Sequence, residues 1–122
     1  METGSDRHSE GRRLLVEACR FVSTGWSQFG DARSVNGAPV KPWSEAAVSW
    51  SLLGALVAAV EDGAGRHGEA VTIIDLAAAC ALLGRVVDAD SLAAWNDAPE
   101  RSQADVVDAL MTASEADEGA SG

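Results

Sequence analysis

Apolar residues recur along this chain at the spacing of an α-helix in several separate segments. Between residues 12 and 22 they follow each other at steps of one and three or four, which places them on one face of a helix. Later segments show the same periodicity, interrupted by glycine and polar residues. Together these patterns predict helices over about 10–22, 44–63, 69–83, 90–95 and 102–114.

Polar residues that satisfy free backbone groups mark the expected helix ends. Ser44 is a candidate N-cap for the second helix. The third helix starts near 69, or at Thr72 if that residue caps it, and Gly84 is its expected stop. Ser102 and Asp105 have the spacing of a capping box for the last helix.

The second helix is apolar most of the way round, so we expect it to be the central and most buried helix. Gly54 lies inside it and costs about 1 kcal/mol relative to alanine in an exposed helix. A glycine in this setting usually allows a close approach. We therefore expect a neighbouring helix or an aromatic ring to contact the chain at Gly54.

The segment from 25 to 42 has glycines, prolines and no helical periodicity. Asn36-Gly37 is a strong hairpin signal, because both central residues of a type I′ turn need positive φ. The candidate strands are Trp26–Arg33 and Ala38–Lys41. A two-stranded hairpin is only marginally stable alone, so we expect it to pack against the helices. The predicted fold is mainly α, a compact bundle of four to five helices with one β-hairpin packed on its side.

We expect one domain over 10–114, with flexible termini at 1–9 and 115–122. Hydrophobic residues make up 47% of the 122-residue chain, which is enough for a core. The formal net charge of −10 argues against nucleic-acid and anionic-membrane partners and leaves cationic or neutral ones open. The first ten residues do not resemble a signal peptide, and the longest apolar stretch is too short to span a bilayer. We expect a cytoplasmic protein, with a homodimer left open.

The sequence contains no strong motif for metal, nucleophile or phosphate chemistry. His8 and His67 have no ligand partners at metal spacing, so no metal or cofactor is expected. Cys19 and Cys80 lie in apolar helical segments, which favours buried free thiols over a disulfide or a reactive thiol. The Gly-x-Gly-x-x-Gly spacing at 63–68 follows a helix rather than a strand and is typical of a hinge.

The most distinctive segment is the bend from Trp95 to Arg101, which combines an aromatic ring, an amide, a carboxylate and a guanidinium. One interpretation is structural: Trp95 fills the core, polar groups satisfy loop amides, and Arg101 pairs with Asp97. The other is a pocket, since binding sites are mostly apolar with a few convergent polar groups. The pocket candidates are Trp26, Gln28, Trp50, Trp95, Asn96, Asp97 and Arg101.

These motifs, in this order, resemble those of a family of small proteins of unknown function from actinobacteria and their phages. The matching residues are Gly25-Trp26-x-Gln28, the Asn-Gly turn, Trp50-Ser-Leu-Leu-Gly54-Ala55-Leu56 and Trp95-Asn96-Asp97-x-Pro99-x-Arg101. The resemblance covers about 12–110 and implies a bacterial cytosolic origin, without implying an activity. One departure is Ser51, where members of the family often carry cysteine.

Two functional hypotheses follow. The first is a non-enzymatic accessory protein that binds a small molecule or a protein partner, because the candidate region is aromatic and polar but has no nucleophile or metal motif. The alternative is a cofactor-free cyclase or isomerase of specialised metabolism, which needs only a shaped cavity and one or two acid–base groups. In that enzyme, Asp97 would act as acid or base.

Overall fold

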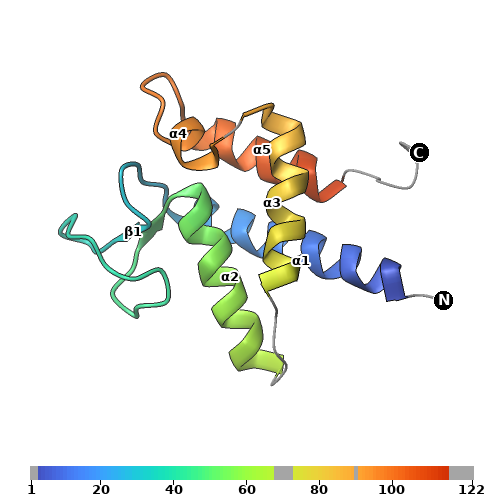
Figure 1. Cartoon of the computed structure of the whole chain (residues 1–122). Coiled ribbons are helices and arrows are strands. Elements are labelled where there is room, and N and C mark those ends of the chain that lie inside the picture. The colour runs from blue at the N-terminus through green and yellow to red at the C-terminus, as the bar shows by residue number, and fades with distance from the viewer. Residues whose placement is uncertain (1–2, 68–72, 90, 116–122) are drawn as a thin grey trace.

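The computed structural model describes residues 3–67, 73–89 and 91–115 (Figure 1). Within them the chain forms a mainly helical fold with a two-stranded antiparallel sheet, which confirms the predicted fold class. The elements are α1 (Thr3–Thr24), β1 (Ala32–Arg33), β2 (Ser49–Trp50), α2 (Leu52–His67), α3 (Ile73–Val87), α4 (Leu92–Asn96) and α5 (Gln103–Glu115).

The long first helix is the centre of the bundle. α1 packs against α2, α3 and α5, and Figure 1 shows it running behind α2 and α3. Leu14, Leu15, Ala18 and Val22 form its core face and are almost fully buried. The expectation that the second helix is the central one is therefore wrong. α2 also contacts three helices, but only α1 packs extensively on all three of its neighbours. The expected strong burial of the second helix is confirmed, since Leu52, Ala55, Leu56 and Ala59 are almost fully buried.

The second helix begins at Leu52, eight residues later than Ser44 predicted. The Ser51 hydroxyl accepts a hydrogen bond from the Gly54 amide at 3.0 Å, so Ser51 is the N-cap. The Ser44 hydroxyl instead accepts from the Ala46 amide at 3.0 Å within a tight turn. Ser49 and Trp50 are extended because they pair with β1, and this long-range pairing overrides the local capping signal at Ser44.

The third helix passes through Gly84 and ends at Val87, so the predicted stop is wrong. Asp88 ends it in the left-handed region, with φ of 54°, and its amide donates to the Gly84 carbonyl at 2.8 Å. Val86 and Val87 pack against the core, and this burial keeps the last turn helical. The predicted cap at Thr72 lies outside the described residues.

The capping box predicted for the last helix is confirmed, and the short helix before it is also capped by a serine. Ser91 caps α4 and accepts from the Ala94 amide at 3.1 Å. Ser102 and Asp105 form the reciprocal capping box of α5, with distances of 3.1 and 3.2 Å. The first helix, in contrast, already starts at Thr3 rather than near residue 10.

The chain does reverse at Asn36-Gly37, but with a different turn and a different strand partner from those predicted. Gly37 has φ of 84°, whereas Asn36 does not have positive φ, so the type I′ turn is replaced by a three-residue loop with Gly37 in the left-handed position. Arg33 and Pro39 form only an isolated bridge across this loop. The sheet pairs β1 with β2 in the register Ala32 to Trp50 and Arg33 to Ser49.

The loop segment that carries these strands rests directly on α2. A Cβ placed on Gly54 would overlap the Asp31 carbonyl, and the same carbonyl oxygen accepts from the Ser51 amide at 3.0 Å. The expected close approach at Gly54 therefore exists, but loop backbone makes it rather than a helix or a ring.

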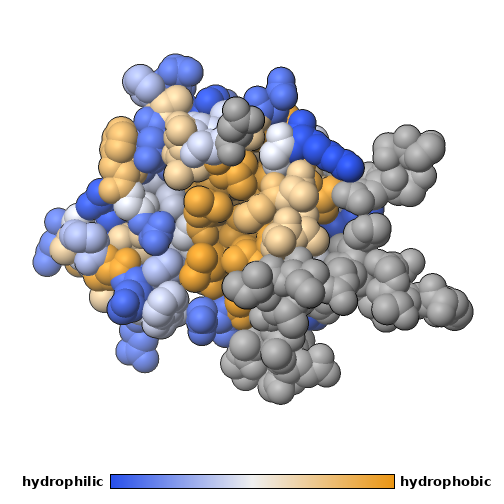
Figure 2. Space-filling view, in the orientation of Figure 1, coloured by the Kyte–Doolittle hydropathy of each residue, from blue (hydrophilic) through white to orange (hydrophobic). Residues whose placement is uncertain are grey.

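One face of the molecule carries an apolar band. Figure 2 shows it in the centre of the view, over α2 and α3. Partly buried residues of these helices that pack on the core include Leu53, Val60, Leu76 and Cys80. No helix within the described residues is long and apolar enough to cross a membrane.

Candidate functional site

Asn96, at the end of α4, is the hub of the predicted site. Its side chain is 1% exposed. Its Oδ1 accepts from the Trp26 indole N–H at 2.8 Å and from the Leu52 amide at 3.0 Å. Its Nδ2 donates to the Ser27 carbonyl at 3.2 Å and to the Asp97 carboxylate at 3.0 Å. One amide side chain thus ties the loop after α1, the start of α2 and the α4 bend together.

Gln28 and Asp97 also take part in this hydrogen-bond network. Gln28 Nε2 donates to the carbonyls of Asn96 and Ala98, both at 3.0 Å. Asp97 Oδ1 accepts from the Phe29 amide at 2.9 Å. Phe29 has φ of 63°, an unusual conformation for a bulky residue, and this hydrogen bond helps to hold it. The polar atoms of the bend are therefore largely engaged with one another.

Trp95 and Arg101 form a stack beside the network. The guanidinium carbon of Arg101 lies 3.9 Å from the centre of the Trp95 ring, which is a cation–π contact. Arg101 Nε also donates to the Trp95 carbonyl at 2.8 Å. Arg101 thus closes the bend through Trp95, and the structure does not contain the ion pair with Asp97 that the sequence suggested.

The seven candidate residues consequently fall into three groups. Four of them share the Asn96 network, namely Trp26, Gln28, Asn96 and Asp97. Trp95 and Arg101 stack alongside it. The backbone of Trp50 bridges that of Trp26, but its side chain is engaged apart from the network, because its indole N–H donates to the Pro42 carbonyl at 2.9 Å and its ring packs on Phe21. A role in ligand binding for the first two groups stays a prediction.

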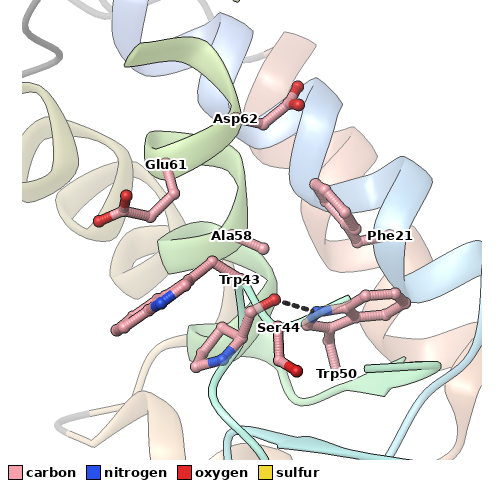
Figure 3. Close-up of a pocket in the computed structure, with 8 residues that line it drawn as sticks. Phe21, Trp43, Ser44, Trp50, Ala58, Glu61 and Asp62 are labelled. Carbon is pink, nitrogen blue, oxygen red and sulfur yellow. Dashed lines mark hydrogen bonds between the residues drawn. The ribbon is translucent and has the colours of Figure 1, made fainter. Parts of the chain in front are cut away.

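Trp50 lines a cleft that the sequence did not indicate (Figure 3). The cleft has a volume of about 330 Å³. It lies where α1, α2 and the 42–50 segment meet. Its lining residues are Phe21, Pro42, Trp43, Ser44, Trp50, Ala58, Glu61 and Asp62.

Aromatic side chains line the cleft on two sides of the α2 residue Ala58. Figure 3 shows Trp43 on one side, Phe21 and Trp50 on the other, and Ala58 between them. The Phe21 and Trp50 rings have centroids 4.9 Å apart and are tilted by 59°, so they form one rigid wall. Trp50 is 7% exposed, whereas Trp43 is 52% exposed. One wall is thus part of the core and the other projects into solvent.

The rim of the cleft is acidic. Glu61 and Asp62 are consecutive residues of α2, and Figure 3 shows Glu61 on the side of Trp43 and Asp62 on the side of Phe21. Ser44 adds a hydroxyl, whose oxygen accepts from the Ala46 amide. Sequence reasoning missed this site because its residues come from three separate segments. The available signal was Trp43, a tryptophan in the polar, proline-containing stretch Lys41-Pro42-Trp43-Ser44.

Comparison with known proteins identifies the family. The model of DUF6197, a family of unknown function, matches residues 7–116. The chain belongs to DUF6197. No curated protein matches this DUF6197 chain, and no solved structure does.

In this DUF6197 chain, Ser51 is a structural residue. Its hydroxyl caps α2, and its amide donates to the Asp31 carbonyl. Both bonds hold the loop against the helix. Since a thiol is a weaker hydrogen-bond acceptor than a hydroxyl, serine suits this cap better than cysteine does.

Both cysteines are free thiols and partly buried. Cys19 Sγ donates to the Val107 carbonyl at 3.9 Å. Burial raises the pKa of the Cys80 thiol above its ordinary value, because desolvation disfavours the thiolate. Among the described residues, no three His, Cys, Asp or Glu side chains are placed to hold a metal ion.

We predict that Cys80 reacts slowly with thiol reagents in the folded protein. In a Cys19→Ser variant, which leaves Cys80 as the single thiol, the rate of reaction with an aromatic disulfide at pH 8 should be at least about tenfold lower when native than when unfolded, because reactivity follows the thiolate fraction. The rate should rise as the pH is raised further, since deprotonation becomes easier. Equal rates in the native and unfolded protein would contradict the prediction.

Proposed function

We propose that this DUF6197 protein is a non-enzymatic binding protein that holds a small organic molecule in the cleft between Trp43 and the Phe21–Trp50 wall. The observation that carries this proposal is the cleft itself. It is concave, has aromatic side chains on two sides and carries a few polar groups at its rim, as ligand sites do. Its volume of about 330 Å³ suits a small metabolite.

The half-exposed Trp43 supports the same proposal. Large aromatic side chains usually bury most of their surface, because each contributes 150–250 Å² of contact area. Trp43 leaves 52% of its surface exposed while it stands across from a buried aromatic wall. A flat molecule placed between the two walls would cover this surface, and the gain in buried apolar area would favour binding.

The binding proposal is better supported than the enzyme alternative. A cofactor-free cyclase or isomerase would need Asp97 to exchange a proton with a substrate. Asp97 Oδ1 instead accepts from the Phe29 amide and from the Asn96 side chain, and both bonds shape the bend. A carboxylate that organises two chain segments in this way serves the fold.

We base the proposed partners, location and origin of the protein mainly on its amino-acid composition. The formal net charge of −10 favours a partner that is neither nucleic acid nor an anionic membrane. A cytoplasmic location and an actinobacterial or phage origin agree with the resemblance described above and with eight Arg against one Lys, which is typical of a GC-rich genome. A protein partner and a homodimer remain compatible with the cleft proposal, because the cleft needs only one chain.

We predict that Trp43→Ala weakens ligand binding and leaves the fold intact. A fragment library should be screened by ligand-observed NMR, and hits should be measured against wild type and variant. Loss of one aromatic wall should weaken binding at least about tenfold, which corresponds to about 1.4 kcal/mol. The melting temperature should change little, since Trp43 is half-exposed.

Phe29→Ala is the matched control, because Phe29 is 70% exposed and does not line the cleft. It should bind fragments as wild type does. A screen without hits, or hits that bind Trp43→Ala as well as wild type, would refute the proposed function.

A further inference from the structure

We infer that the ligand of this cleft is an organic cation, an amine or quaternary ammonium compound of small size. This inference rests on the proposed function and adds the chemical class of the ligand. Two independent features support it: the aromatic side chains that face the cavity, and the sign of the charges at its rim.

The aromatic side chains have the chemistry that recognises cations. A cation over the face of tryptophan is attracted by the ring quadrupole, and tryptophan is the best of the aromatic residues for this contact. The cleft offers two tryptophans and one phenylalanine within a volume of about 330 Å³. Cages of this kind bind quaternary ammonium groups, whose weak hydration makes their transfer from water inexpensive.

Trp43 already contacts a cation of the chain. The ammonium nitrogen of Lys41 lies 5.5 Å from the centre of the Trp43 ring. Lys41 and Trp43 together line a second hollow, with Asp31, Pro39, Val40, Pro42 and Val57, whereas Lys41 is absent from the lining of the aromatic cleft. The protein thus already uses this ring as a cation acceptor, and the ligand would make the same kind of contact from the cleft.

The rim supplies negative charge. Glu61 is exposed and stands beside Trp43, and Asp62 stands beside Phe21. Asp62 also interacts with another group of the chain, so Glu61 is the carboxylate assigned to the ligand. Arg20 lines another hollow together with Asp62, and its guanidinium is paired with Glu17 at 3.2 Å. The overall charge of −10 adds a long-range attraction for cations.

Anions do not fit the same cleft. The indole N–H of Trp50 is engaged by the Pro42 carbonyl, and the described residues that line the cavity include no arginine or lysine. A phosphate or carboxylate would meet the exposed Glu61 carboxylate and be repelled by it. The cleft therefore selects by charge sign as well as by shape.

The test uses a pair of molecules that differ in charge and little in shape. Choline and its neutral analogue 3,3-dimethylbutan-1-ol, and benzyltrimethylammonium as a larger cation, should be titrated into the full chain and followed by NMR chemical-shift changes and tryptophan fluorescence. We expect each cation to bind at least about tenfold more tightly than the neutral analogue. Inorganic phosphate should not bind.

Single substitutions distinguish the contribution of the Glu61 charge to ligand binding from that of the Trp43 ring. Glu61→Gln should weaken cation binding severalfold and leave neutral binding unchanged. Glu45→Gln removes the same charge from an exposed position outside the cleft and should change neither. Trp43→Leu keeps apolar bulk but removes the ring, so it should lose the cation preference. Melting temperatures of all variants confirm that they are folded.

The two proposals fail in different ways. If the neutral analogue binds as tightly as choline, or if Glu61→Gln and Glu45→Gln behave alike, the cation inference is overturned and the cleft remains a binding site. If neither the cations nor any fragment binds, both proposals are overturned.

Discussion

Replacing Gly54 by alanine is expected to destabilise the protein by about 3 kcal/mol, in spite of alanine being the better helix former. The new Cβ would overlap the carbonyl of Asp31, which is backbone and cannot rotate away. That carbonyl also accepts from the Ser51 amide at the start of α2, so moving it would break this bond. For a domain of this size the melting temperature should fall by about 10 °C.

Gly84→Ala is the matched control for this variant. Gly84 also lies inside a helix, α3, but a Cβ there meets nothing within 4 Å. The substitution should therefore stabilise the protein by about 0.5–1 kcal/mol through helix propensity alone. Thermal and urea unfolding followed by circular dichroism would measure both variants. If the two substitutions shift stability in the same direction, the close approach at Gly54 is not tight.

Asn96→Ala is expected to have a comparably large effect. The truncation leaves the Trp26 indole N–H and the Leu52 amide without their acceptor, and the Ser27 carbonyl without its donor. A buried polar group that loses its partner costs about 1–3 kcal/mol, so the loss should be at least about 3 kcal/mol. The 1% exposure of Asn96 means that bulk water cannot readily replace the lost partners.

The control for Asn96 is Asn36→Ala, which removes the same group from an exposed loop. It should change stability by less than about 1 kcal/mol. A double-mutant cycle with Trp26→Phe isolates one bond, because phenylalanine keeps the ring but lacks the N–H donor. Additive effects of Asn96→Ala and Trp26→Phe would show that the 2.8 Å contact between them carries no stability.

The sequence anticipated part of the candidate site. It singled out the Trp95–Arg101 bend and linked it to Trp26 and Gln28, and the structure brings these residues into contact. What it missed is that their polar atoms are mostly bonded to one another, and that a cleft opens elsewhere, between Phe21 and Trp43. A sequence pattern shows which residues carry polar or charged groups. It does not show whether those groups are already hydrogen-bonded to a neighbouring residue in the fold.

The sequence by itself determined the features that depend on neighbours a few positions apart. The five helical segments follow from apolar periodicity, and the caps at Ser91 and Ser102 follow from hydroxyls that reach amides three residues ahead. The tertiary structure alone decided where α2 starts, that α3 continues through Gly84, and that β1 pairs with β2. Those outcomes depend on contacts between distant segments, such as the hydrogen bond from Leu52 to Asn96, and the sum of such contacts outweighs local preferences that act over a few residues.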